Sequence, residues 1–586
     1  MKNQLLPISL LVFSLMLVVQ MDWSPPSPPS PDPVNRYEKM HLPSEHFFLQ
    51  RSYPDPVFDI RGYEAAMKQA LRQEANSIRS TGNSWVTQGP GNIGGRMNVV
   101  TIHPTNPNII YTGSAAGGVH KTTDGGQFWT PIFDDFAYLS IGAITLDPSD
   151  PNTIYVGTGD PNISGYPFIG DGVYKSTDAG QTWTHLGLAE ARIISRIIVH
   201  PTNPQIVFAS GMGLPFERNN DRGLYRSQDG GQSWTQVLFL SNQAGIIDLV
   251  MDPFNPDVLY ASGWDRIRNN QESLVTGMNA TVWKTSDGGT NWNLVSNNNG
   301  FPALPQGRIG LTISQQTPNL LFALVVGTNS QAEGVYQSTD GGQNWANVLT
   351  NISPNALGGF GWYFGQIRVN PQDDSELWIL GVDLYSSQDN GSNFSLTGPP
   401  WWNYTFHADK HDLQFDSNND IYVATDGGLY KSTDGGTTFA DIENIANTQF
   451  YRVALNPHQT GTYYGGAQDN GSTGGNVANF NNWPRIFGGD GFQMRFDPSN
   501  ANTFYAETQN GNLVVTTDGG NNFFSHTNGL AAGDRRNWDM PFVLSAFDPD
   551  RQYTGTYRVY RNTTGAGGQW QSISPDLTDG VIFGNA

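Results

Sequence analysis

One short phrase recurs along the chain and limits what the chain can fold into. It has the form Ser/Thr-x-Asp-x-Gly-x-x-Trp/Phe, and "VYKSTDAGQTW" at residues 173–183 is a typical copy. Glycine permits the left-handed backbone of a hairpin turn, and an aspartate there can accept hydrogen bonds from turn amides. The phrase therefore predicts a hairpin with an aromatic residue that packs between sheets. The aspartates of its eight copies are Asp124, Asp178, Asp229, Asp287, Asp340, Asp389, Asp434 and Asp518.

A second repeated stretch precedes most copies. "HPTNPNIIYTG" at His103 and "DPFNPDVLYAS" at Asp252 each combine a turn rich in Pro and Asn with alternating apolar residues, which is typical of a strand after a turn. Ten such units follow one another at intervals of about 40 to 60 residues, the range of a propeller blade. The sequence therefore predicts an all-β fold, a β-propeller of about ten four-stranded blades.

The recurrence of the aspartate also decides its role. A catalytic acid is needed once or twice, whereas this aspartate stands in eight copies of one turn. A further copy, "VYRNTTGAGGQW", keeps Trp570 but has Gly565 where the acid is expected. We interpret the repeated aspartates as structural.

Net charge and the absence of cysteine exclude several classes of site. The chain has 31 Lys and Arg against 52 Asp and Glu, a net charge of −21, and no cysteine. An acidic chain disfavours non-specific nucleic-acid binding, which depends on basic residues that neutralise phosphates. Without cysteine there is no disulfide and no thiolate metal site.

The N-terminal segment predicts export. Lys2 precedes an apolar run over residues 5–19, which fits a secretory signal and is short for a membrane span. The small-residue cleavage pattern is missing, so residues 1–20 are a signal peptide or an N-terminal anchor. Residues 21–84 read as a Pro-rich linker and a short amphipathic helix. We expect an extracytoplasmic location: secreted, periplasmic or at the cell surface.

The repeated phrase resembles the Asp-box, or BNR, repeats of sialidases, sortilin-type receptors and xyloglucan-active two-propeller glycoside hydrolases. Longer phrases such as "FHADKHDLQFD", "YGGAQDNGS" and "GGDGF" resemble a group of exported bacterial proteins named for a sortilin N-terminal (VPS10-like) domain or as putative glycosyl hydrolases. The resemblance implies a β-propeller and leaves the activity open.

The same resemblance implies a division of the chain. In the two-propeller hydrolases, seven blades are followed by seven more. Here residues 85–445 would form a first seven-bladed propeller, and residues 446–586 would supply further blades that begin a second one. The alternative is a single ring of ten blades, which uses the same length without a second propeller.

Two carboxyl groups are needed to hydrolyse a glycosidic bond, one as acid and one as base or nucleophile. The xyloglucan-active family has one Asp in an early stretch similar to RTDxGGxY. The matching stretch here, "TGSAAGGVHKT", has Ala115 or Ala116 at that position, so the resemblance implies that this acid is missing. The family's second acid corresponds to Asp490 in "GGDGF", the catalytic candidate.

Other polar groups predict ligand contacts. His407, Asp409 and His411 would share one face of an extended strand and could bind a divalent cation, the one cofactor considered; a hydrogen-bonded network is the alternative. Flat aromatic rings stack on sugars when exposed. The ligand-binding candidates are Gln468, Asp469, Asn470, Trp401 and Trp402.

Two functions follow from these features. The leading hypothesis is an exported binding or scaffold protein that recognises a protein or glycan through propeller loops. The alternative is a glycoside hydrolase acting on a polysaccharide. The expected partners are a glycan or an extracellular protein, with no nucleic acid and with a membrane only through an uncleaved anchor.

Overall fold

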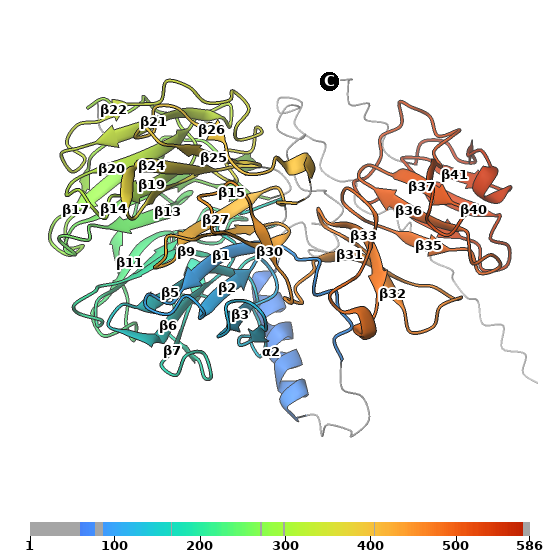
Figure 1. Cartoon of the computed structure of the whole chain (residues 1–586), viewed down its shortest axis with the longest axis horizontal. Helices are drawn as coiled ribbons and strands as arrows, with labels where there is room; N and C mark the ends of the chain where they lie inside the picture. The colour runs from blue at the N-terminus through green and yellow to red at the C-terminus, as the bar shows by residue number, and fades with distance from the viewer. Residues whose placement is uncertain are drawn as a thin grey trace, which may run out of the picture.

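The computed structural model describes residues 59–76, 86–165, 167–269, 272–296, 299–403 and 405–577. The predicted signal peptide or anchor and the Pro-rich segment lie outside these ranges. The described residues form ten four-stranded antiparallel sheets and one two-stranded sheet, so the prediction of an all-β chain of about ten four-stranded blades is confirmed. Figure 1 shows the sheets in two groups, a large one that contains β1 to β30 and a smaller one that contains β31 to β42.

The first group is a ring of seven sheets. Their strands, in chain order, are β1–β4 (Met97–Ile102, Ile110–Ser114, Val119–Thr122, Thr130–Pro131), β5–β8 (Ile141–Asp147, Asp150–Thr158, Val173–Ser176, Thr184–His185), β9–β12 (Ile194–Val199, Val207–Gly211, Gly223–Ser227, Thr235–Leu238), β13, β14, β17 and β18 (Ala244–Met251, Leu259–Asp265, Val282–Thr285, Asn293–Leu294), β19–β22 (Ile309–Ile313, Leu321–Val326, Ala332–Ser338, Ala346–Asn347), β23–β26 (Gln366–Asn370, Asp373–Leu380, Leu384–Ser387, Ser395–Leu396) and β27–β30 (Lys410–Phe415, Ile421–Thr425, Gly428–Ser432, Ala440–Ile442).

The ring closes because the first sheet packs on the seventh. Val100 of β1 lies in one apolar cluster with Tyr422 and Leu429 of the seventh sheet, and its main-chain N–H donates to Asp412 Oδ2 of β27 (3.3 Å). A central cavity of about 570 Å³ is lined by the first strand of each of the seven sheets. The ten-bladed ring, the alternative considered above, is therefore not formed.

Three further sheets follow the ring. Their strands are β31–β34 (Phe450–Leu455, Tyr463–Ala467, Gly471–Gly475, Arg485–Phe487), β35–β38 (Met494–Phe496, Phe504–Thr508, Asn512–Thr516, Phe524–Ser525) and β39–β42 (Phe542–Leu544, Gln552–Gly555, Val559–Asn562, Gln571–Ser572). We retain a domain boundary near residue 445 as a proposal, since the connection from β30 to β31 leaves the ring there.

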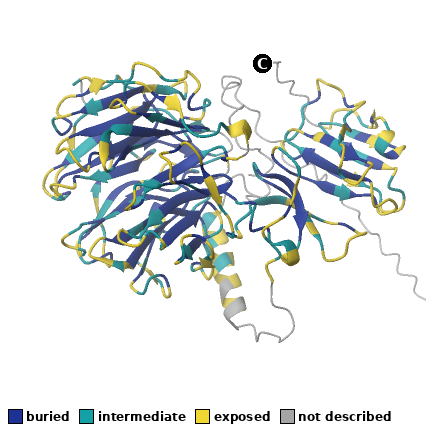
Figure 2. Cartoon of the chain, viewed as in Figure 1, coloured by how far each residue is buried: buried dark blue, intermediate teal, exposed yellow. Residues whose placement is uncertain are grey.

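The core lies between neighbouring sheets. It is formed by side chains that point alternately to the two faces of each strand. In β20, Phe322 and Leu324 belong to the cluster shared with the sixth sheet, whereas Ala323 and Val325 belong to the cluster shared with the fourth. Side chains of a strand point alternately to its two faces, so one apolar strand fills two interfaces. Figure 2 shows this burial throughout the strands of the ring, with exposed residues concentrated in the turns.

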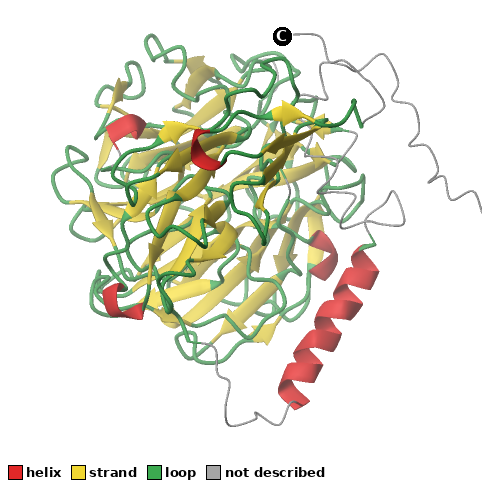
Figure 3. Ribbon diagram, turned by 90° about the vertical axis from the view of Figure 1, so that its right-hand side faces the viewer, coloured by secondary structure: helices red, strands yellow, loops and turns green. Residues whose placement is uncertain are grey.

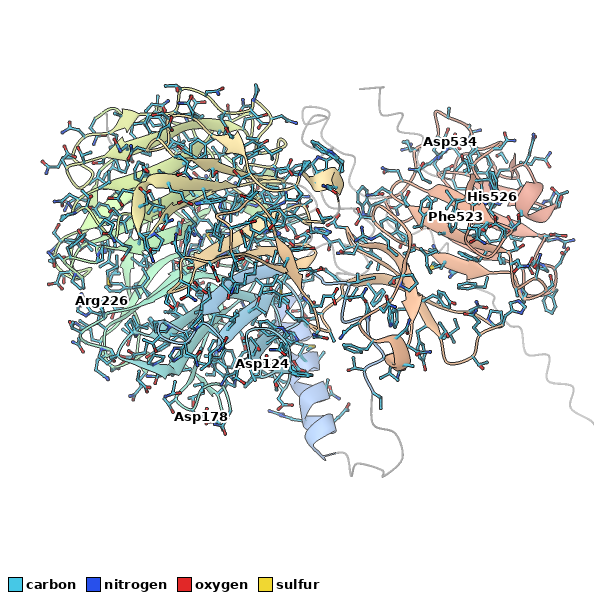
Figure 4. All side chains as sticks on the ribbon, viewed as in Figure 1. Asp124, Asp178, Arg226, Phe523, His526 and Asp534 are labelled. Atoms are coloured by element: carbon cyan, nitrogen blue, oxygen red, sulfur yellow. The ribbon has the colours of Figure 1, made fainter. Side chains whose placement is uncertain are left out.

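The repeated aspartates brace hairpin turns. Asp178 Oδ1 accepts from Ser176 Oγ (2.7 Å) and from the main chain of Thr182 (2.8 Å). Because Thr182 also donates to it through its hydroxyl, the pKa of Asp178 falls to about 2. Trp183 donates to the carbonyl of Ile132 in the preceding sheet (2.8 Å). Figure 4 places Asp178 at an outer turn of the ring.

The copy without the acid differs from the alignment used above. Asn562 ends its strand as Ser176 does, so Thr564, two residues on, takes the place of Asp178. Gly565 corresponds instead to Ala179: both have positive φ, and both donate their N–H to a carbonyl near the start of the second strand of the sheet, Asn152 O for Ala179 and Asp550 O for Gly565. This turn has one extra residue before its aromatic residue, Trp570, which explains the shift.

A helix and a hairpin complete the fold. Helix α2 (Ile60–Asn76) lies against the side of the ring (Figure 3), where Glu64 forms an ion pair with Arg192. The hairpin β15–β16 (Ile267–Arg268, Ser273–Leu274) is an insertion in the fourth sheet. Short 3-10 turns are η2 (Ala189–Ala191), η3 (Trp401–Asn403), η4 (Val477–Asn479) and η5 (Gly565–Gly567). Across the described ranges, every helix is too short or too polar to span a bilayer.

Candidate functional site

Four aspartates gather where the ring meets the eighth sheet. Asp409 directly precedes β27, Asp426 directly follows β28, Asp469 lies between β32 and β33, and Asp490 lies between β34 and β35. In an antiparallel pair, the start of one strand and the end of the next lie at the same end of the sheet, which brings Asp409 next to Asp426. One carboxylate oxygen from each of Asp409, Asp426 and Asp469 lies within 4.8 Å of the other two. The main-chain N–H of Asp469 donates to Asp490 Oδ1 (2.8 Å).

Asp426 is the charged anchor of this group. Arg96 binds it with two hydrogen bonds, Nε to Oδ1 (2.8 Å) and Nη2 to Oδ2 (2.9 Å). His411 Nε2 lies 2.5 Å from the same Oδ1. Burial alone would raise the pKa of Asp426, but Arg96 and His411 outweigh burial and hold that pKa well below its usual range. Asp426 is therefore ionised at any ordinary pH.

Asp409 has the opposite environment. Its carboxyl makes no hydrogen bond to another described residue, and its backbone is left-handed (φ 65°). Two main-chain bonds hold this conformation: Asp409 donates to Val382 O (2.9 Å) and accepts from the N–H of Asp426 (3.2 Å). Burial, and then the charge of Asp426, raise the pKa of Asp409 to about 7. A side chain in a strained backbone beside an ionised carboxylate is typical of a functional position.

Asp469 and Asp490 continue the acidic group into the last three sheets. Gln509 Nε2 donates to Asp490 Oδ2 (2.8 Å), and Gln468 Nε2 donates to Asp469 Oδ2 (3.1 Å). Burial raises the pKa of both carboxyls, that of Asp469 well above its usual range, with the charge of Asp426 as a further cause. Each extra negative charge here is costly, which favours the protonated forms of Asp469 and Asp490.

A chain of polar side chains within the ring leads to His411, the hydrogen-bond partner of Asp426. Arg308 Nη1 donates to Asn162 Oδ1 (2.9 Å), and Asn162 Nδ2 donates to His411 Nδ1 (3.3 Å). This leaves His411 Nε2 as the donor to Asp426, which fixes the tautomer. Asp160 is fully buried beside these side chains, and its Oδ2 has no hydrogen-bond partner among the described residues.

Aromatic side chains line the part of the site that the last three sheets contribute. The ring of Tyr451 stacks on Phe492 (centroids 4.6 Å apart), and Phe492 meets Trp538 edge-on (6.0 Å). Trp538 is 43% exposed. Burial, and then the charges of Asp490 and Asp469, raise the pKa of Tyr451.

The structure brings some predicted residues together and not others. Asp490, Asp469 and Asp409 share one group, and Asn470 joins it by donating to the carbonyl of Asp426 (3.0 Å). Trp401 and Trp402 lie on η3 and are 48% and 60% exposed. Figure 1 shows this short gold turn on the side of the ring that faces the last three sheets.

The predicted strand face of His407, Asp409 and His411 is not formed. β27 begins only at Lys410, and the left-handed backbone at Asp409 breaks the alternation. The four imidazole nitrogens already have partners: Ala408 O and Asp469 O for His407, and Asn162 and Asp426 for His411.

The residues at this position do not fit a divalent cation well. Both oxygens of Asp426 bind Arg96, whose guanidinium already neutralises the most acidic carboxylate. A cation would have to displace this pair or remain beside the guanidinium charge. The alternative of a hydrogen-bonded network describes the contacts of His407 and His411, whereas the carboxyl of Asp409 has no hydrogen bond to another described residue.

Two residues of the site were missed by the sequence analysis. Arg96, in "GGRMN", stands out only as an isolated arginine, and nothing in the sequence pairs it with Asp426. Asp426 stands in "TDGGLY" at residues 425–430, a closer match to the family stretch RTDxGGxY than the one around Ala115. Asp426 was not identified because it lies in the seventh sheet, whereas the family stretch was expected early in the chain.

Comparisons with known proteins agree with this architecture. The Sortilin-Vps10 family (sortilin, neurotensin receptor 3) matches residues 171–301. A xyloglucanase of Paenibacillus sp is 22% identical over 359 residues, 56% of this chain and 33% of that protein. The xyloglucanase Xgh74A of Acetivibrio thermocellus is 20% identical over 417 residues, 53% of this chain and 48% of that protein. The chain thus spans a third to about half the length of these relatives.

A solved structure shows the same fold. The crystal structure of an ancestral GH74 enzyme matches with a TM-score of 0.57 at 17% identity, and the match covers 82% of this chain and 69% of that one. At this identity the match establishes the fold and not the activity. The chain is a β-propeller protein that resembles the sortilin and glycosyl hydrolase propellers.

Proposed function

We propose that this protein is a glycoside hydrolase that acts on a polysaccharide, with its site between the ring and the last three sheets. The observation that carries the proposal is the convergence of Asp409, Asp426 and Asp469 within 4.8 Å, next to Asp490. Glycosidases need one carboxyl that keeps its proton and one that is ionised, and opposed pKa shifts assign these roles. The pKa of Asp426 is lowered and that of Asp409 is raised, so the group holds an ionised carboxylate beside a carboxyl that keeps its proton.

The relatives support a glycan as the partner. Two of them are xyloglucanases, and the aromatic wall of Tyr451, Phe492 and Trp538 could stack on sugar rings beside the acids. Exposed Trp401 and Trp402 would extend this contact along a polymer. We further propose export of the protein, because its N-terminal segment reads as a signal.

Turnover of polysaccharide tests the proposal. Purified protein is incubated with xyloglucan and a panel of β-glucans, and reducing ends are counted. We expect release from at least one polymer, and a loss of about 10²- to 10⁴-fold in Asp490→Asn, which removes a carboxyl next to the acidic group. Asp518→Asn is the matched control, since Asp518 braces an outer turn of the neighbouring hairpin and should leave turnover unchanged.

A second function, binding without hydrolysis, is favoured by the exposed pair Trp401 and Trp402. In that case the protein would hold a glycan or an extracellular protein through these loops. Absence of turnover on every polymer, together with retention on immobilised xyloglucan that Trp402→Ala abolishes, would decide for binding and against hydrolysis.

A further inference from the structure

Equivalent backbone positions in the other sheets of the ring can be compared with the positions of Asp409 and Asp426. In six sheets of the ring, the residue that ends or follows the second strand donates its N–H to the carbonyl of the residue before the first strand, over 2.7 to 3.2 Å. These pairs therefore occupy equivalent backbone positions at the same end of the ring. They are Arg96/Ala115, Ser140/Gly159, Ile193/Met212, Gln243/Arg266, Arg308/Val326 and Asp409/Asp426.

The seventh sheet keeps this hydrogen bond but differs in the residues that form it. Of the six pairs, only Asp409/Asp426 carries carboxyl groups, and it carries two of them. The neighbouring first sheet has Arg96/Ala115, and its arginine reaches across to Asp426. A repeat that places two acids where its other copies place none indicates a function that the fold itself does not require.

The two acids cannot share one role. Asp426 accepts from Arg96 and His411 and has no proton to give. Asp409 carries no such bond, is partly open to solvent, and is held by its main chain, so its carboxyl is free to meet a ligand. We propose that Asp409 is the general acid of the hydrolysis and that Asp426 is the positioning residue that keeps it protonated. This inference rests on the proposed function.

The chemical step balances with the groups present. The O–H bond of Asp409 breaks as its proton moves to the glycosidic oxygen, and the bond from that oxygen to the anomeric carbon breaks with its electron pair. Water attacks the anomeric carbon and gives a proton to the Asp490 carboxylate. Gln509 and the N–H of Asp469 stabilise the charged form of Asp490. Exchange with solvent returns both carboxyls to their starting states.

Several charged or titratable groups face Asp409 and set its proton affinity. The burial of Asp409 and the charge of Asp426 favour the protonated form, as does Asp490; Lys410 and Arg96 oppose it. Asp469 lies within 4.8 Å, and Tyr363, in the loop before β23, is a further titratable group whose own pKa the charge of Asp409 raises. The balance gives a pKa of about 7, which allows Asp409 to donate a proton near neutral pH.

Dependence on the leaving group tests the assignment. Asp409→Asn keeps the side-chain shape, and asparagine tolerates a left-handed backbone. For xyloglucan, whose sugar leaving group needs a proton, we expect kcat/KM to fall by about 10²- to 10⁴-fold. For a dinitrophenyl β-glycoside, whose leaving group needs none, we expect a loss below about tenfold. The wild-type kcat/KM for xyloglucan should fall as pH rises through about 7, and the variant should lose this dependence.

A matched control separates Asp409 from any acid of similar pKa. Burial, with Glu443, raises the pKa of Asp441 to about 7, and Asp441 lies on β30, the strand of the same sheet farthest from β27. Asp441→Asn should keep both rates and the pH dependence. An unchanged thermal unfolding midpoint in each variant shows that the fold is kept.

Each outcome decides between the two proposals. Equal losses on both substrates, or no loss on either, would overturn the role of Asp409 as acid while the hydrolase proposal stands on Asp490→Asn. If the wild type hydrolyses neither substrate, the hydrolase proposal fails and takes the acid role with it. A pH dependence that persists in Asp409→Asn would assign the titrating acid to another carboxyl of the group.

Discussion

The ring and the last three sheets are built from the same kind of four-stranded blade, but the innermost strands of these blades are buried to different extents. In the ring, innermost strands such as β5 and β13 are almost wholly buried. In the eighth sheet, Val453 and Leu455 of the innermost strand are 74% and 72% exposed. β35, which has a sheet on either side, buries Met494 and Phe496 as a ring strand would.

This difference shows where the stability of a blade originates. Each sheet covers its apolar faces only with its neighbours, so a closed ring leaves no face open and a row of three leaves two. The carboxyl group lies where these two environments meet: Asp409 and Asp426 come from the ring, and Asp469 and Asp490 come from the row of three.

The largest expected effect compares one residue from each environment. Trp378 of β24 is fully buried and donates from Nε1 to Glu376 (2.8 Å). Trp378→Ala should lower the free energy of unfolding by about 3–5 kcal/mol, because it leaves a large cavity in the ring. Val453→Ala, on the open face, should change it by less than about 0.5 kcal/mol. Guanidinium titrations of both variants measure the difference; comparable losses would mean that the face of β31 is covered in solution.

The features that recur in every blade could be predicted from the sequence. Alternating apolar runs, turn residues and the phrase around Asp178 were enough for blades, hairpins and the structural role of the aspartate. The extra residue before Trp570 defeated the alignment at Gly565, since a turn can lengthen by one residue without a change in composition. Local patterns carry no information on such a shift.

The site was only half visible from the sequence, for a physical reason. Asp490, Asp469 and Asp409 stood out because they break the repeat, but Asp426 is one of many Asp-Gly turns and Arg96 is an isolated arginine. Their importance comes from a contact between residues 330 positions apart, formed only when the first sheet closes on the seventh. The left-handed backbone at Asp409 likewise depends on Val382 of the neighbouring sheet.

A smaller effect contrasts an acid of the site with an acid of an outer turn through pH. The pKa of Asp409 is about 7 in the folded protein, above its unfolded value, so the folded state binds the extra proton and loses stability as pH rises from about 4 to 7. Asp409→Asn should therefore raise the thermal unfolding midpoint at pH 8 and leave it unchanged at pH 4.

Asp178 should behave in the opposite sense. Its pKa of about 2 lies below the unfolded value, so its stabilisation is present above pH 4 and is lost as pH falls through about 2. Asp178→Asn should lower the midpoint at pH 8, by a small amount because the turn is exposed. Midpoints measured at both pH values compare the two variants, and a shift of the same sign at pH 8 would refute the contrast.

The smallest expected effect is that of a chelator, for which we predict no shift. A divalent cation held by Asp409, Asp426 and Asp469 would bridge the ring and the row of three sheets, and it would raise the thermal midpoint by mass action. In the structure, Arg96 already supplies the positive charge at this junction from within the ring. Scans with EDTA, with added calcium and with added magnesium should therefore coincide. A lower midpoint in EDTA that either metal restores would show that a cation, and not the guanidinium alone, balances the four acids where the closed ring meets the open row.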